Sequence, residues 1–299
     1  MVNVYAVDAG ELAEVVSAAL GRRCRLTPLG VKCTYPVFRG EAGDVPPIFV
    51  KVGTREEWVR TRDLLRAVGD CGLFSRFVTE EPIDYKGHAV FVMEWKESRV
   101  VFPEDMNSHQ IESFVAGCVK LGKALAGAGR GDRDGTGSSP VELFGIISQY
   151  VCRHRIAGRL IKGLLDIPAA ERTFGSRPLS VIHGDFHAKN FGFAGDEFAS
   201  VFDFDKLTQG LACMDLANAL VERFSCLGLS AATCRRLAER TRYIVSKAPW
   251  SREDFVIACN VVRLQFAVRR VLKHPNSSWV ALDILRRDRK IREFLTCLG

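Results

Sequence analysis

Apolar positions in the first third of the chain change between helical spacing and short runs typical of strands. An apolar face at helical spacing runs through residues 10–22, and a second one through 56–68. Short apolar runs bounded by turn residues predict strands at 24–29, 35–40, 48–52, 77–79 and 89–95. The pattern therefore predicts a small antiparallel sheet with one inserted helix, ending near residue 96.

Beyond residue 96 the apolar spacing becomes mainly helical. It predicts helices at 108–126, 141–165, 213–227, 230–247, 252–272 and 278–296. A glycine-rich loop at 127–139 lacks the Gly-Lys-Ser/Thr ending of a phosphate-binding P-loop, so we expect no phosphate cradle there. With 299 residues, the chain is long enough for two medium domains. We predict an α+β fold with a sheet-rich lobe at 1–96 and a mainly helical lobe at 97–299.

The composition is that of a globular protein. Apolar residues make up 47% of the chain and charged residues 26%, which argues against a disordered chain. No apolar run is long enough to cross a membrane, and the N-terminal residues lack the basic head of a secretory signal. Ten cysteines are scattered without a Cys-x-x-Cys pair, so we expect reduced, mostly buried thiols in a cytoplasmic protein.

The positive charge is concentrated at the C-terminal end. The formal net charge of the chain is +7, yet residues 235–299 alone carry +9 and residues 1–96 are neutral. Basic residues between apolar ones indicate amphipathic helices with either a solvated face or a surface for an anionic partner. The sequence has no zinc finger, no aromatic nucleic-acid motif and no long basic tail, so no nucleic-acid partner is expected.

One stretch carries residues suited to phosphoryl transfer. An apolar run leads into His183-Gly-Asp185, Asn190 follows five residues after that aspartate, and a second apolar run ends in Asp203-Phe-Asp205. A kinase needs a carboxylate that orients the acceptor hydroxyl, and amide and carboxylate oxygens that hold Mg²⁺ against the phosphates. Ordinary turn preferences would explain single Asp or Asn residues, but not this ordered set. A metal-dependent hydrolase is disfavoured, because the histidines lack metal-ligand spacing.

The pattern His-x-Asp-x-x-x-x-Asn, with Asp203 13 residues further on, resembles the aminoglycoside phosphotransferase/choline kinase family of protein-kinase-like enzymes. Three more segments resemble this family: Asp215-Leu-Ala, the nucleotide lysine in Phe49-Val-Lys51-Val, and the hinge in Val92-Met93-Glu94-Trp95. The resemblance covers roughly residues 24–222, in the expected order. It implies a two-lobed fold that binds ATP and magnesium in the cleft between a nucleotide-binding lobe and a catalytic and acceptor-binding lobe.

The resemblance also implies a role for each matching residue. For the reaction, it implies Asp185 as the catalytic base, Asn190 with Asp203 or Asp205 as magnesium ligands, and Lys51 on the α- and β-phosphates. It also implies Glu57 or Glu56 as the ion-pair partner of Lys51. Adenine would be bound by the backbone of Met93, Glu94 and Trp95. The catalytic loop would be held in its conformation by His183 and Asp215. His187 and Lys189, which lie on that loop, are candidate acceptor contacts.

The acceptor is predicted to be a neutral or anionic hydroxyl compound, such as a sugar, a sugar-containing envelope component or another metabolite. A segment of net charge +9 beside the expected acceptor pocket disfavours a polycationic aminoglycoside. An aminoglycoside or choline/ethanolamine kinase is the alternative.

Two other classes of protein are disfavoured. A protein kinase would need a glycine-rich loop and an activation segment, but residues 29–35 hold one glycine and the stretch from Asp203 to Asp215 is short. The intact set of Lys51, Asp185, Asn190 and Asp203 argues against a nucleotide-binding pseudokinase.

Overall fold

The computed structural model describes residues 7–29, 36–128, 177–204, 206–226, 228–274 and 279–297. The chain forms two compact units, Met1–Glu97 and Ser98–Gly299, each described below by itself. The predicted helix at 141–165, most of the loop at 127–139 and the metal-ligand candidate Asp205 lie outside the described residues. The predicted α+β class, with a small antiparallel sheet and a mainly helical remainder, is confirmed.

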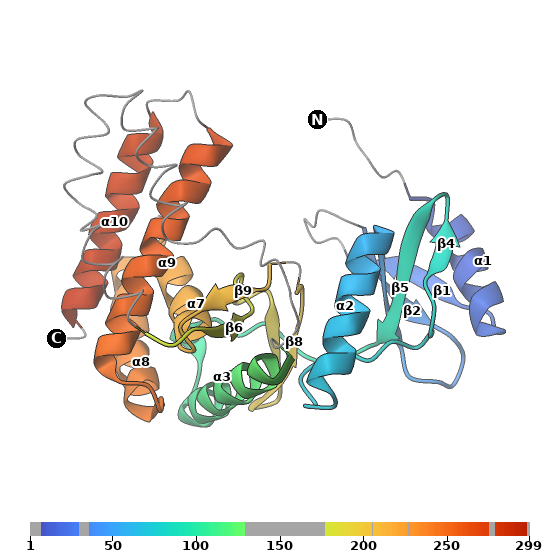
Figure 1. Ribbon diagram of the computed structural model, residues 1–299, viewed down its shortest axis with the longest axis horizontal. Helices are drawn as coiled ribbons and strands as arrows, with labels where there is room; N and C mark the ends of the chain where they lie inside the picture. The colour runs from blue at the N-terminus through green and yellow to red at the C-terminus, as the bar shows by residue number, and fades with distance from the viewer. Residues whose placement is uncertain are drawn as a thin grey trace. The chain divides into compact units, whose positions relative to one another are not determined.

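Unit 1 is built on a five-stranded antiparallel sheet with strand order β1-β2-β3-β5-β4 (Figure 1). Its strands are β1 (Arg25–Pro28), β2 (Val37–Glu41), β3 (Ile48–Gly53), β4 (Ile83–Tyr85) and β5 (His88–Glu94), and its helices are α1 (Ala9–Leu20) and α2 (Arg55–Val68). The Asp8 side chain accepts the first N–H groups of α1, and Thr54 with Glu57 forms a capping box at the start of α2. These side chains satisfy amides that have no partner inside the helix, which explains why the helices begin there.

The two faces of this sheet carry different helices. On one face, Val16 of α1 joins a buried core that includes Val50 of β3. On the other face, Trp58 of α2 shares a buried cluster with Phe91 of β5. Side chains alternate along a strand, so Lys51 lies on the face opposite to Val50. Its partner across the ladder is Phe91, which places Lys51 on the α2 face.

The strands of unit 1 differ from the prediction at two points. The run at 77–79 forms only an isolated bridge from Phe77 to β5 in place of a strand. The apolar pattern does not predict β4, which pairs with β5 across a tight turn at Lys86 and Gly87, with φ of 53° and 79°. Positive φ at both central residues is typical of a type I′ hairpin turn. A strand of three residues with the exposed Asp84 at its centre has too little apolar pattern to be recognised.

Unit 2 combines two short antiparallel strand pairs, β6 with β9 and β7 with β8, with a set of helices (Figure 1). Its elements are η1 (Pro103–Asp105, a 3-10 turn), α3 (Ser108–Ala128), β6 (Ser180–Ile182), β7 (Phe191–Ala194), β8 (Glu197–Val201), β9 (Thr208–Gly210), α7 (Met214–Phe224), α8 (Ala231–Lys247), α9 (Arg252–Lys273) and α10 (Trp279–Cys297). The five predicted helices that fall within the described residues are confirmed to within a few residues at each end. Among the described helices, none combines the length and the apolar character that crossing a membrane requires.

An aromatic cluster joins α3 to the second strand pair. Phe114 of α3 is fully buried, and its ring centroid lies 5.0 Å from that of Phe191 and 5.6 Å from that of Phe198. Phe186 stacks on Phe191 at 5.0 Å. Buried aromatic pairs contribute packing beyond their buried area. Because Phe186 lies between β6 and β7, the cluster anchors the loop that carries the candidate catalytic residues.

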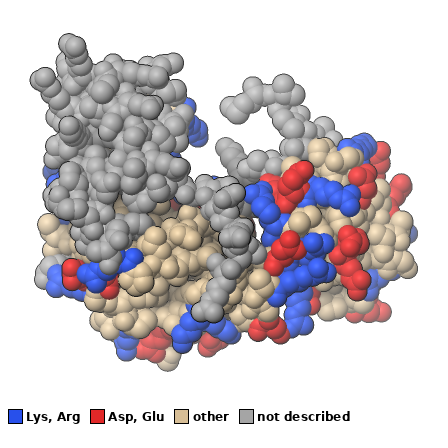
Figure 2. Space-filling model, in the orientation of Figure 1, with Lys and Arg blue, Asp and Glu red and all other residues tan. Residues whose placement is uncertain are grey.

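Charged side chains are used differently in the two units. Acidic and basic side chains are interleaved on the face of unit 1 in view in Figure 2, in line with its neutral balance. In unit 2, Arg270 and Arg287 both contact Asp283, at 3.2 and 3.1 Å. Arg287 also donates to the carbonyl of Ser225, at the end of α7, at 2.7 Å. Part of the C-terminal positive charge therefore holds the helices of unit 2 together and is not a solvated face.

A buried ion pair connects η1 to α7, and we expect its loss to destabilise unit 2. Glu104 is 3% exposed and pairs with Arg223, whose guanidinium lies 4.2 Å from the centre of the Phe102 ring. In Arg223→Met the buried carboxylate loses its cation, so the free energy of unfolding should fall by about 3–5 kcal/mol in urea denaturation. Arg236→Met is the control, because Arg236 makes an exposed pair with Asp105 at 3.9 Å, which is worth less than about 1 kcal/mol. Equal losses in the two variants would contradict this role of the buried pair.

The described cysteines are free thiols, and Cys24, Cys118, Cys213 and Cys259 are buried. Burial raises the pKa of Cys213 to about 12 and holds the pKa of Cys118 and Cys259 well above the ordinary value. Since the thiolate is the reactive form, these three should resist iodoacetamide at pH 8, and the partly exposed Cys71 should react. Peptide mass spectrometry of the alkylated native protein checks this. Rapid labelling of Cys118 or Cys259 would mean that the core of unit 2 opens readily.

Candidate active site

The loop from His183 to Asn190 connects β6 to β7 and carries the candidate catalytic residues. Gly184 on this loop has a φ of 76°, in the left-handed region, and a Cβ atom there would lie 2.1 Å from the carbonyl oxygen of Lys206. Both features restrict the position to glycine. The central residue of His-Gly-Asp is therefore dictated by the backbone, which turns tightly against the segment that follows β8.

His183 is fully buried and bonded on both ring nitrogens. Its Nε2 lies 2.7 Å from the carbonyl oxygen of Phe202, and the N–H of Asp185 donates to its Nδ1 at 3.4 Å. Because Nδ1 is the acceptor, we assign the proton to Nε2, which donates to the carbonyl. The imidazole thus ties the catalytic loop to the end of β8 and has no nitrogen left for proton transfer.

Asp215, in the first turn of α7, holds the backbone at the start of the loop. Its carboxylate accepts the N–H of His183 at 2.8 Å and the N–H of Gly184 at 3.1 Å. The side chain is 5% exposed, and this burial raises the pKa of Asp215, although His183 and the two backbone bonds act in the opposite direction. These bonds set the orientation of the peptide groups that precede Asp185.

Asn190 closes the loop at its other end. Its side-chain amide donates to the carbonyl of Asp185 at 2.9 Å, and its own backbone carbonyl accepts the N–H of Phe202 at 2.9 Å. The next residue, Asp203, is exposed and has a φ of 61°, which is uncommon outside glycine and often marks a functional position. The loop and the end of β8 thus bring Asn190 and the backbone before Asp203 together.

The donor atoms at this point suit a magnesium ion. The amide nitrogen of Asn190 is bonded to the loop, so its oxygen could serve as a ligand, and Asp203 could add a carboxylate. Mg²⁺ prefers oxygen ligands, and in kinases it takes few of them from the protein and the others from phosphates and water. Among the described residues no group of three or more His, Cys, Asp or Glu side chains lies close enough together to hold a metal ion.

The Asp185 carboxylate is 13% exposed and is paired on both oxygens. Lys206 Nζ lies 2.6 Å from its Oδ2, and Arg269 Nη1 lies 3.1 Å from its Oδ1. Burial alone would raise the pKa of Asp185, but the Lys206 and Arg269 cations, with a smaller contribution from His187, bring it below the ordinary value. Asp185 is therefore held as a carboxylate.

The candidate acceptor contacts His187 and Lys189 lie on the same loop. The N–H of Lys189 donates to Nδ1 of His187 at 3.3 Å, and the Lys189 side chain is exposed. Burial lowers the pKa of His187, although the nearby Asp185 opposes this change. The contacts of both residues with an acceptor stay predictions.

In unit 1, Lys51 and Glu57 lie on the same face of the sheet. Lys51 Nζ is 5.6 Å from the centre of the Phe91 ring. Glu57 is buried, and a Cβ atom at Gly53 would lie 2.8 Å from its Oε2. Gly53 is two residues from Lys51 along β3, so the two positions face the same side. Glu56, by contrast, is exposed. This geometry favours Glu57 as the partner of Lys51, a pairing that stays a prediction.

The predicted hinge is partly engaged within unit 1. The N–H of Glu94 donates to the carbonyl of Arg76 at 2.9 Å, and the N–H of Trp95 donates to the carbonyl of Pro47 at 3.1 Å. Met93 packs against the cluster around Trp58. Adenine recognition by this segment would therefore use backbone groups other than these two amides.

A cavity of about 480 Å³ in unit 1 lies between the C-terminal half of α2 and residues 69–80. Arg62, Arg66 and Phe74 are among the residues that line it. Neither Lys51 nor the segment from Met93 to Trp95 lines this cavity, so it is separate from the predicted nucleotide contacts.

Comparison with known families decides the class of protein. The model of the phosphotransferase enzyme family matches residues 53–243, more than half of the chain. The chain belongs to this family. The matched region includes the loop from His183 to Asn190, together with Asp203 and Asp215. The predicted enzyme class, a phosphotransferase with an alcohol group as acceptor, is confirmed.

Several solved structures share the fold over nearly the full chain. Aminoglycoside phosphotransferase APH(4)-Ia has a TM-score of 0.62 at 11% identity, with 98% of this chain and 100% of that chain covered. A putative aminoglycoside phosphotransferase from Ralstonia eutropha has a TM-score of 0.61 at 16% identity, with 96% of each chain covered. Choline kinase from Cryptosporidium parvum has a TM-score of 0.56 at 12% identity, with 92% and 88% covered. No curated protein matches the chain.

Two basic residues at the site were not among the candidates taken from the sequence. Lys206 directly follows Asp203-Phe-Asp205, so its place beside a carboxylate-rich motif is a local signal that could have identified it. Arg269 lies 84 residues after Asp185 along the chain, and its contact depends on how α9 packs in unit 2. Within the sequence it is one of several arginines in a basic helix, and spacing alone does not distinguish it.

Proposed function

We propose that this phosphotransferase moves the γ-phosphoryl group of ATP to a hydroxyl group of a small molecule, with Asp185 as the catalytic base. The observation that carries the proposal is the fixed position of the Asp185 carboxylate. Asp215 bonds the backbone before it, and Asn190 bonds its carbonyl. A carboxylate held in this way can orient a hydroxyl and receive its proton without further ordering of the loop.

Magnesium is proposed to bind through the amide oxygen of Asn190 and the carboxylate of Asp203. When bound, the ion would neutralise charge on the transferred phosphoryl group. Asp205 remains a further candidate ligand. The proposal for ATP has support from solved members of the same fold, since one was determined with AMP-PNP and Ca²⁺ and another with ADP and hygromycin B.

Unit 1 is proposed to bind the nucleotide. Lys51 would contact the α- and β-phosphates, with Glu57 holding its ammonium group in place. The segment from Met93 to Trp95 would contact adenine through its remaining backbone groups. Because ATP is the phosphoryl donor, we propose that the enzyme works in the cytoplasm.

The acceptor is proposed to be a neutral or anionic hydroxyl compound, such as a sugar, an envelope component or another metabolite. The positive charge of residues 235–299 supports this class over aminoglycosides. An aminoglycoside or choline/ethanolamine kinase is the alternative, in view of the named substrates of structurally similar proteins.

Nucleotide binding and acceptor-dependent ADP formation test this function. Titration with Mg–AMP-PNP should show binding to the wild-type protein, and Lys51→Met should weaken it by removing the proposed phosphate contact. Lys86→Met is the matched control, because Lys86 pairs with Glu11 on the surface, where its side chain is 58% exposed. ADP formation should then rise on addition of a hydroxyl acceptor. A wild-type protein that binds no Mg–AMP-PNP would contradict the proposed function.

A further inference from the structure

Arg269 connects the basic helix α9 to the catalytic loop. Its Nη1 donates to Oδ1 of Asp185 and its Nη2 to the carbonyl of Gly184, both at 3.1 Å. The Arg269 side chain is 41% exposed, so a solute can reach it. The next residue, Arg270, makes a different contact: it pairs with Asp283 within the helical part of unit 2.

Both oxygens of the Asp185 carboxylate are bonded to cations. Lys206 donates to Oδ2 and Arg269 donates to Oδ1. Each oxygen can accept a second hydrogen bond, but a cation that holds the oxygen lowers its basicity toward the hydroxyl proton. Lys206 follows the proposed metal ligand along the chain, whereas Arg269 comes from a separate helix. An incoming group that binds Arg269 would free Oδ1.

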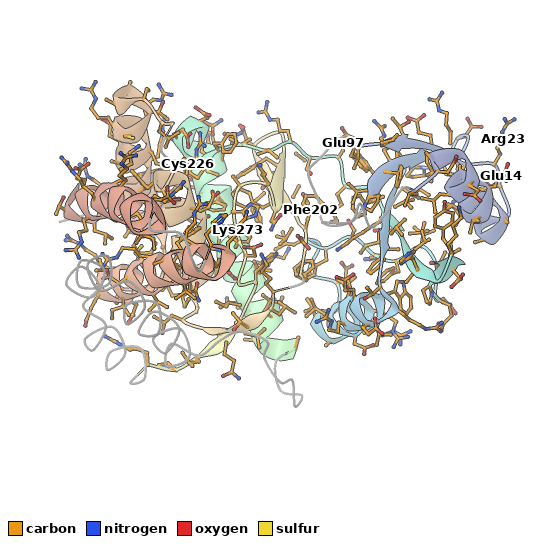
Figure 3. All side chains as sticks on the ribbon, turned by 90° about the horizontal axis from the view of Figure 1, so that it is seen from above. Glu14, Arg23, Glu97, Phe202, Cys226 and Lys273 are labelled. Carbon is orange, nitrogen blue, oxygen red and sulfur yellow. The ribbon has the colours of Figure 1, made fainter. Side chains whose placement is uncertain are left out.

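The chemistry of Arg269 specifies what that group is. A guanidinium presents parallel N–H donors that match a carboxylate or a phosphate, and here two of them are divided between a carboxylate and a carbonyl. Lys273, labelled at the end of α9 in Figure 3, follows one turn later on the same helical face and is exposed. Lys273 makes no hydrogen bond or ion pair in the described part of the chain.

The Asp185 carboxylate is balanced by cations, since it is paired with Lys206 and Arg269. Burial raises the pKa of Glu222 of α7, although the charges of Arg223 and Lys189 oppose this change. A polycationic acceptor would therefore find the Asp185 carboxylate already compensated, whereas an anionic acceptor would find Arg269 and Lys273 exposed.

We propose that Arg269, with Lys273, binds a carboxylate or phosphate group of the acceptor, so that the enzyme phosphorylates acidic hydroxy compounds. This specificity role rests on the proposed function. The anionic group replaces Asp185 as the partner of Arg269, and Oδ1 of Asp185 then faces the acceptor hydroxyl. In the transfer, the hydroxyl O–H bond breaks and its proton goes to Asp185. The acceptor oxygen bonds to the γ-phosphorus, and the bond from that phosphorus to the β-phosphate oxygen breaks to release ADP.

The test compares acids with their neutral counterparts. Binding to the protein loaded with Mg–AMP-PNP, and kcat/KM with Mg–ATP, are measured for gluconate and glucose, glycerate and glycerol, and ribose 5-phosphate and ribose. Choline and streptomycin represent cationic acceptors. The wild-type protein should prefer at least one acidic member over its neutral counterpart by about 10- to 100-fold, as expected for a charge-assisted contact. The sugar phosphate and the two sugar acids show which anionic group is preferred.

Arg269→Gln should remove this preference mainly by raising KM for the acidic compound, and Arg269→Lys should retain part of it. Arg286→Gln, at an exposed position on α10, should leave it unchanged. The inference is wrong if no acidic compound is preferred, or if Arg269→Gln lowers kcat equally for acidic and neutral acceptors, as a residue that only positions Asp185 would. Binding of Mg–AMP-PNP separates the two proposals. If the acidic preference is missing but the wild-type protein binds Mg–AMP-PNP, only the specificity role fails. If the wild-type protein does not bind Mg–AMP-PNP, the proposed function fails as well.

Discussion

Asp185→Asn is expected to lower kcat/KM for phosphoryl transfer by about 10²- to 10⁴-fold, the contribution typical of a positioned general base. The amide keeps the shape of the side chain but cannot receive the hydroxyl proton. Binding of Mg–AMP-PNP should persist, because the proposed metal ligands and Lys51 are unchanged. Steady-state kinetics with the preferred acceptor, together with a nucleotide titration, separates these two effects.

The control for Asp185→Asn is Glu239→Gln, which removes one carboxylate from an exposed position on α8. Its kcat/KM should stay at the wild-type value. If Asp185→Asn retains wild-type kcat/KM, the acceptor proton goes elsewhere and the role assigned to Asp185 is wrong.

Asp215→Asn is expected to lower both stability and activity. The Asp215 carboxylate accepts two backbone N–H groups at 2.8 and 3.1 Å, whereas an amide has one oxygen and would turn its own N–H₂ toward the other donor. A hydrogen bond to a charged group contributes about 1.5–3 kcal/mol, so loss of one bond and a mismatch at the second should cost about 2–4 kcal/mol. The free energy of unfolding from urea denaturation measures this.

Activity should fall further in Asp215→Asn than the loss of folded protein explains, because the start of the catalytic loop loses its anchor. The measurement is kcat at a temperature where the variant remains folded. Asp105→Asn is the control, since Asp105 is exposed and its ion pair to Arg236 is long, at 3.9 Å. Wild-type stability in Asp215→Asn would mean that the loop holds its shape without this carboxylate.

The local pattern of the chain was sufficient to predict most helices and the class of fold. Helices such as α8 and α9 repeat their apolar positions over many residues, so neighbouring turns reinforce the same signal. The three-residue strand β4 is too short to repeat an apolar pattern in this way. It is recognisable only through its pairing with β5 and the backbone geometry of Lys86 and Gly87.

The residues of the candidate site also differ in whether the local sequence predicts them. His183, Asp185 and Asn190 are close in sequence and lie on one loop, so their spacing carries the prediction. Arg269 reaches Asp185 only because of the packing of α9, which no local pattern encodes. The net charge of the C-terminal segment indicated the kind of residue to expect there, but not which arginine would reach the carboxylate.

Mass spectrometry of the acceptors after incubation with Mg–ATP tests phosphoryl transfer to a small molecule. We expect that a small hydroxyl compound gains one phosphoryl group, that ADP forms in equal amount, and that neither product forms when EDTA removes the metal. Asp185→Asn should form far less of both. Phosphoryl groups found on protein side chains, or ADP formed by the wild-type enzyme without a phosphorylated small molecule, would contradict the proposed small-molecule kinase activity.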